Sequence, residues 1–181
     1  MVSYEELLQR QLIKKIGTVE KEAYVSFHLN NYKIDFASAL KFLEQKNSKY
    51  TAIAGYYSVL NITLWYFAKY YNLKISEEDT GVHTNCLIVL EHFIKEELLK
   101  KKIIQLLEKA KTEFLYFTIL KKNKEETLPL MLKQSADKRK KYTYYSIERE
   151  LPKETDQLNE VKMFVKSVVE PYISILERLK P

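Results

Sequence analysis

The apolar stretch from Tyr50 to Tyr71 constrains the fold of this chain more than any other feature of its sequence. Large apolar side chains recur within it at steps of three and four residues, at Ile53, Tyr57, Leu60, Leu64, Phe67 and Tyr71. This spacing places them on one face of an α-helix, and further apolar residues such as Ile62 and Trp65 leave little polar surface. Because such a helix must be covered by other elements, we expect it at the centre of a bundle. Gly55 within it is either a point of close packing or a small defect.

Other segments show the same helical spacing. We expect helices over residues 33–46, over 82–120 with a break near 95–102, over about 129–145 and over 158–179, the last kinked at Pro171. The chain has only 3 Gly and 4 Pro, whereas β-sandwiches and barrels need such residues at frequent turns. The sequence therefore predicts an all-α, up-and-down helical bundle of four to five core helices, with an additional N-terminal helix.

The first 30 residues form a separate segment of the sequence. Apolar and charged residues alternate at helical spacing over residues 3–29, and Gly17 interrupts the pattern. Asn30 and Asn31 predict a turn. We therefore expect an N-terminal helical extension over residues 1–30 and a bundle domain over residues 31–181. Residues 72–81 are expected to be a polar connection.

Several classes of site are excluded by the residues that are missing. The single cysteine, Cys86, excludes an intramolecular disulfide and a CxxC motif, and its neighbours Leu87 and Leu90 predict a buried thiol rather than a nucleophile. The sequence has no GxxxxGK[ST], GxGxxG or HExxH motif. His83 and Cys86 lie three residues apart but lack a third metal ligand. We therefore expect no metal and no cofactor.

The sequence also predicts a cytoplasmic protein without a membrane association. It contains no run of 18 apolar residues, and its N-terminus, MVSYEELLQRQ, is charged where a signal peptide would be apolar.

The positive charge of the chain is localised. The formal net charge is +6, and the segment from Lys95 to Lys141 alone carries 14 Lys and Arg against seven Asp and Glu. A localised basic surface favours polyanions such as RNA, nucleotides or an acidic protein. The alternative is that lysine-rich helices only keep the protein soluble, because 26 of the 30 basic residues are Lys and Arg is the usual residue for bidentate phosphate contacts.

One segment, Asp137–Tyr145, combines cations with aromatic rings. Its sequence is DKRKKYTYY, and Arg139 and Tyr142 are three residues apart, so they share a face of a helix. Cations beside rings that can stack are typical of nucleotide and single-stranded RNA sites. The alternative is structural, since tyrosines at the end of a bundle helix often close the core while lysines face water.

The order of several short motifs resembles the HEPN superfamily, helical bundles that include the substrate-binding partners of minimal nucleotidyltransferases. The similar segments cover roughly residues 33–179 and are AxxGYYSVLN at residues 52–61, Gly81-Val82-His83, Arg139-x4-Tyr144 and Val161-x2-Phe164-Val165. His83 is similar to the histidine that often opens the third helix of the family. Arg139-x4-Tyr144 resembles the Arg-plus-aromatic version of its signature.

The resemblance implies a choice between catalysis and binding. Many members are metal-independent RNases or toxins, in which Arg is followed after four to six residues by His and two such motifs meet at a dimer interface. This chain has Tyr144, Tyr145 and Ser146 instead, and no histidine follows residue 93. A tyrosine with a pKa of about 10 is a poor base near neutral pH. We therefore expect a protein without catalytic residues.

The resulting hypothesis is a homodimeric module that binds nucleotide or RNA phosphate. Arg139 would contact the phosphate, Lys138, Lys140 and Lys141 would supply the positive field, and the remaining candidates are Tyr142, Tyr144 and His83. Two alternatives stay open. One is a divergent RNase with Tyr144 or His83 moving the proton, and the other is a protein-interaction subunit of a nucleotidyltransferase.

Overall fold

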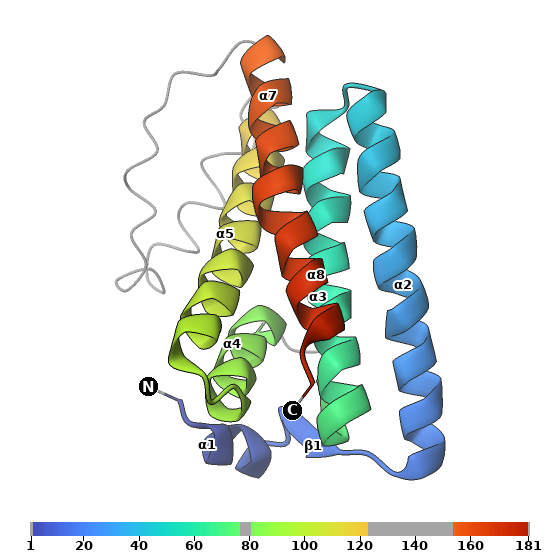
Figure 1. Cartoon of the computed structure of the whole chain (residues 1–181), viewed down its shortest axis with the longest axis vertical. Helices are drawn as coiled ribbons and strands as arrows, with labels where there is room; N and C mark the ends of the chain where they lie inside the picture. The colour runs from blue at the N-terminus through green and yellow to red at the C-terminus, as the bar shows by residue number, and fades with distance from the viewer. Residues whose placement is uncertain (1, 77–80, 123–153, 181) are drawn as a thin grey trace.

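In a computed structural model that describes residues 2–76, 81–122 and 154–180, the chain forms an all-α bundle (Figure 1), as the sequence predicts. Its long segments are α2 (Thr18–Glu44), α3 (Ser48–Tyr71), α5 (Glu97–Lys122) and the C-terminal run of α7 (Glu154–Phe164), η1 (Val165–Val169) and α8 (Glu170–Arg178). They lie side by side and alternate in direction along the chain. The shorter helices α1 (Tyr4–Gln9) and α4 (Val82–Phe93) pack at one end of the bundle.

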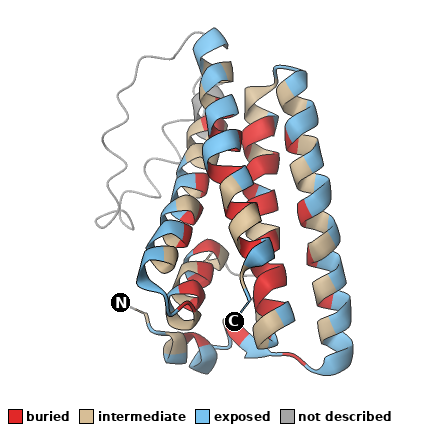
Figure 2. Ribbon diagram, viewed as in Figure 1, coloured by how far each residue is buried: buried red, intermediate tan, exposed pale blue. Residues whose placement is uncertain are grey.

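Helix α3 lies at the centre, as its apolar sequence predicts. Ala52, Val59 and Ile62 are completely buried, and the buried residues of Figure 2 are concentrated on this helix. Helix α2 packs along one side of α3, while α5 and the C-terminal helices pack on others. Gly55 is a point of close packing, because a Cβ atom there would lie 2.9 Å from Cε1 of Phe164.

A small sheet ties the N-terminal residues to the connection after α3. Strand β1 (Ile13–Lys15) pairs antiparallel with β2 (Leu73–Ile75), with Lys14 opposite Lys74. Both Leu73 and Ile75 of β2 face the core, and Ile75 is completely buried. The prediction of a polar connection over residues 72–81 is therefore wrong for residues 73–75. Strands of three residues are too short for their period to show in the sequence.

Helix α2 continues through the turn that was expected at Asn30 and Asn31. The turn prediction is wrong because burial of Tyr24, His28 and Tyr32 on one side of the helix outweighs the low helix propensity of two asparagines. The division of the chain at residue 30 into an extension and a bundle domain stays a prediction. The break expected near residues 95–102 lies at residues 94–96, between α4 and α5.

The distortion expected at Pro171 takes the form of a π-helical turn. Pro171 has no N–H, and its ring would collide with the carbonyl of Ser167 in a regular α-helix. Residues Val165–Val169 widen into η1, and the N–H of Glu170 bonds to the carbonyl of Val165, five residues back. The chain then resumes as α8.

Candidate functional site

Among the predicted site residues, His83 lies within the described part of the chain. It is the second residue of α4, and its side chain is 6% exposed. Its Nδ1 atom lies 3.4 Å from the hydroxyl of Tyr56 on α3. Burial lowers the pKa of His83 to about 3, and the cation of Lys111 on α5 adds to this effect. The imidazole is therefore neutral at pH 7.

Aromatic rings from α3 and α5 surround this contact. The ring of Tyr56 stacks on Phe114 with centroids 4.5 Å apart, and Tyr57 meets Phe114 edge-on at 6.0 Å. Burial raises the pKa of Tyr56, with smaller contributions from Cys86 and Tyr57, so its hydroxyl stays protonated. Tyr57 is 44% exposed and thus presents an aromatic surface to solvent at the edge of the cluster.

Lys111 supplies the positive charge of the cluster. It lies one helical turn before Phe114 on the same face of α5, and it is partly buried. Burial lowers the pKa of Lys111. In the part of the chain that the structure describes, no carboxylate forms an ion pair with Lys111. Since burying an ammonium group away from a counter-ion is unfavourable, this position favours an anionic ligand.

The arrangement suits binding better than proton transfer. Lys111 can attract an anion and Tyr57 can stack on a planar group, whereas neutral His83 is buried against Tyr56. An imidazole with so low a pKa is a weak base, and a tyrosine with a raised pKa is a weak acid. Neither Tyr56 nor His83 is therefore tuned for acid–base catalysis near neutral pH.

The other predicted site residues lie outside the described residues. They are Lys138, Arg139, Lys140, Lys141, Tyr142 and Tyr144. Their roles stay predictions, as does a meeting of His83 with Arg139. The buried position of Cys86, by contrast, is confirmed, because this side chain is completely buried.

Sequence reasoning missed Lys111 and Phe114 as members of the site, although the sequence contains a signal for the lysine. Lys111 follows the buried Leu107 by four residues and precedes Phe114 by three, so it occupies a core position of the apolar pattern of α5. A charged residue at such a position is uncommon unless it has a partner or a ligand. The charge count over Lys95–Lys141 treats all 14 basic residues alike and so does not distinguish Lys111 from the exposed lysines.

A second polar cluster joins α2 to α3. Nδ1 of the completely buried His28 donates to Oδ1 of Asn61 at 2.7 Å, and Nδ2 of Asn61 donates to Asp35 at 2.8 Å. Burial raises the pKa of Asp35, while its hydrogen bond from Asn61 opposes the change. These bonds require one alignment of the two helices, so we interpret the cluster as a structural device.

Comparisons with models of known protein families, with curated proteins and with solved structures give no match to this chain. Within the described ranges, no helix combines the length and apolar character that a membrane span requires. The same ranges contain no group of three or more His, Cys, Asp or Glu residues that could hold a metal ion. The described residues define an all-α bundle in which a partly buried lysine, Lys111, lies near the buried His83–Tyr56 pair.

Proposed function

We propose that this chain is a non-catalytic, HEPN-like module that binds nucleotide or RNA phosphate through the region of Arg139. The observation that carries the proposal is Lys111, a partly buried cation with no carboxylate partner among the described residues. It lies near His83 and one helical turn before Phe114. The motif order from residue 52 to residue 165 and the segment Asp137–Tyr145 support the same function.

Charge and ring chemistry together explain why a phosphate with an attached base is the favoured ligand. Helix α5 belongs to the segment with the excess of basic residues and leads along the chain to Arg139. Phosphate contacts supply affinity, and stacking on aromatic side chains holds bases without strict sequence preference. The low pKa of His83 and the lack of histidine after residue 93 support binding without cleavage.

The test is a titration of a fluorescent single-stranded RNA with the wild-type chain and three variants. We expect Arg139→Ala and Lys111→Ala each to raise the Kd about tenfold, which corresponds to about 1.4 kcal/mol and is typical of a charged hydrogen bond. Each variant should also reduce the slope of log K against log salt by about 0.7. Lys109→Ala, which removes an exposed lysine from the same helix, should leave the Kd within about twofold.

The same mixtures, run on a denaturing gel in the presence of a chelator, distinguish the alternatives. Intact RNA together with binding lost in Arg139→Ala supports the binding module. Cleavage that leaves 2′,3′-cyclic phosphate ends and disappears in Arg139→Ala would replace it with an RNase. If the wild-type chain does not bind RNA or nucleotide at all, the proposal is wrong and the nucleotidyltransferase-partner hypothesis takes its place.

A further inference from the structure

Helix α2 carries an exposed stripe of mainly apolar side chains, which we call the α2 stripe. It consists of Val19, Ala23, Phe27, Asn30, Ile34, Ala37 and Lys41, all exposed. Steps of three and four residues place these side chains on one face of the helix. Val19 is 87% exposed, Phe27 55% and Ile34 61%, which are high values for large apolar side chains.

The α2 stripe lies away from the bundle core. The opposite face of α2 packs against α3 through the buried residues Tyr24, His28, Tyr32 and Ala39. Helix α2 stands at the edge of the bundle, with its outer face coloured as exposed or intermediate (Figures 1 and 2). Aligned apolar side chains on an outer helix face mark a surface for association rather than scattered exposure.

We propose that the α2 stripe is the interface between two copies of this chain, which pair with their α2 helices antiparallel. A twofold interface between two copies of one helix pairs positions that are equally far from the axis. Phe27 and Ile34 are equally far in sequence from the point between Asn30 and Asn31. A twofold axis through that point sets Phe27 of each copy against Ile34 of the other, and the small residues of the stripe allow the helices to approach closely.

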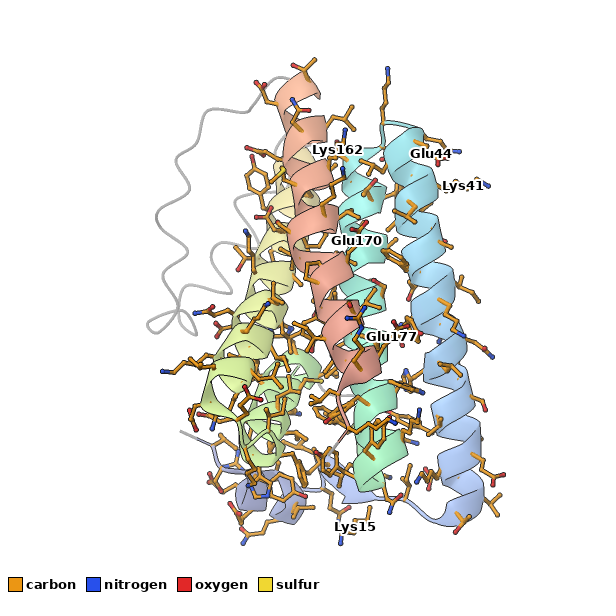
Figure 3. All side chains as sticks on the ribbon, viewed as in Figure 1. Lys15, Lys41, Glu44, Lys162, Glu170 and Glu177 are labelled. Atoms are coloured by element: carbon orange, nitrogen blue, oxygen red, sulfur yellow. The ribbon has the colours of Figure 1, made fainter. Side chains whose placement is uncertain are left out.

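The charges flanking the α2 stripe favour the same arrangement. Exposed Glu20 and Glu22 lie at its N-terminal half, and exposed Lys33 and Lys41 lie at its C-terminal half, where Glu44 in the last turn of α2 is also exposed. Glu20 and Lys41 are also equally far from the proposed axis, and Lys41 points away from the bundle (Figure 3). Antiparallel helices bring Glu20 of one copy near Lys41 of the other.

The antiparallel arrangement stays favoured when parallel helices and the ion pair of Glu20 within its own chain are considered. Parallel helices in register would instead set Glu20 against Glu20 and Lys41 against Lys41, which is unfavourable. Glu20 already forms an exposed ion pair with Lys74 at 3.1 Å, so in the dimer it would lie between two lysines. The inference does not depend on the proposed function, because it uses a different surface.

The first test measures the mass of the full chain by light scattering over a range of concentrations. We expect a species of twice 21.6 kDa for the wild type. Ile34→Glu and Phe27→Glu should each weaken the dimer at least about tenfold, since each places a charge in the centre of the contact. Leu98→Glu, at a position on α5 that is 79% exposed, is the matched control and should leave the dimer intact. Circular dichroism melts verify that each variant is folded.

The second test measures orientation. Lys41→Glu should weaken the dimer, and the double variant with Glu20→Lys should restore it, because both intermolecular pairs are then reversed. Cross-linking with a short bismaleimide gives the geometry directly. A mixture of Glu20→Cys and Lys41→Cys chains should cross-link, whereas each alone should not, and the natural Cys86 is buried and does not interfere.

Three results would overturn the proposal. The first is a wild-type chain that stays at 21.6 kDa at every concentration. The second is a dimer that survives both Ile34→Glu and Phe27→Glu, which would locate the interface elsewhere. The third is efficient cross-linking of Glu20→Cys with itself, which would indicate parallel helices or a different register.

Discussion

At the scale of single residues, several buried hydroxyls of this protein have short, specific hydrogen bonds. Thr63 donates to the carbonyl of Val59 at 2.8 Å, so its oxygen accepts the proton of the completely buried Tyr172 at 2.6 Å. Tyr32 donates to Glu177 of α8, labelled in Figure 3, at 2.8 Å, and burial followed by this bond raises the pKa of Tyr32 to about 12. His83 differs, because its contact with Tyr56 is long and a cation lies near it.

This environment makes His83 a source of acid sensitivity. Its pKa is about 3 in the folded chain and about 6.5 when unfolded, so between these values the unfolded state binds a proton that the folded state does not. The stabilisation that comes from neutral His83 is therefore fully present above pH 6.5 and is lost as the pH falls toward 3. We expect the free energy of unfolding to decrease by about 1.4 kcal/mol per pH unit in this window from His83 alone.

Urea unfolding of the wild type and of His83→Gln between pH 7 and pH 4.5 measures this contribution. The variant should show the shallower pH dependence, because the remaining titratable groups are shared and cancel in the comparison. Parallel profiles for the two proteins would show that folding does not shift the pKa of His83.

At the scale of elements, the π-helical turn of η1 and Gly55 of α3 form one contact. A Cβ at Gly55 would lie 2.9 Å from Phe164 and 3.2 Å from Val169, the first of which precedes the wide turn while the second ends it. In an α-helix, residues five apart point about 140° away from each other. Because π winding bonds each residue to the fifth along, it brings Phe164 and Val169 to the same side, where both reach Gly55.

We expect Gly55→Ala to destabilise the chain by up to about 2 kcal/mol. Overpacking of a core costs about 1–3 kcal/mol, and the gain in helix propensity, about 1 kcal/mol, offsets part of it. A double-mutant cycle with Phe164→Leu, read by urea unfolding, tests the cause. The double variant should be more stable than the sum of the single effects predicts, since the smaller side chain makes room for the new methyl group. Strictly additive effects would mean that the two residues do not collide.

At the scale of the whole molecule, one apolar core connects the two ends of the described bundle. It extends from Leu7 of α1 and Ile13 of β1, along α3, to Ala52 in the first turns of α3 and Val161 of α7. Cys86 is completely buried within this core and is the single cysteine of the sequence. Its thiol therefore reports on the opening of the bundle as a unit.

We expect the thiol of Cys86 to resist labelling under native conditions and to react in proportion to the population of globally opened chains. The measurement is the rate of reaction with a thiol reagent at increasing urea. The free energy extracted from these rates should match the value from circular dichroism if the bundle unfolds cooperatively. Fast labelling without denaturant would instead indicate a local opening of α4, independent of the rest of the core.

The sequence alone determined the helical class, the central position of α3 and the burial of Cys86. These properties follow from local periodicity, because side chains three and four residues apart share a helix face whatever the rest of the chain does. The turn predicted at Asn30 and Asn31 shows the limit of local signals. Propensity disfavoured the helix there, but burial of Tyr32 and its neighbours against α3 decided the outcome.

Only the tertiary structure decided which distant residues meet. Tyr56 and His83 are 27 residues apart, Tyr32 and Glu177 are 145 apart, and neither contact leaves a mark on the periodicity of its own helix. Lys111 illustrates both the contribution of the sequence and that of the tertiary structure. The sequence placed its charge at a core position of α5, and the packing of α5 against α3 and α4 set that charge beside His83, because contacts between helices depend on how whole faces fit together.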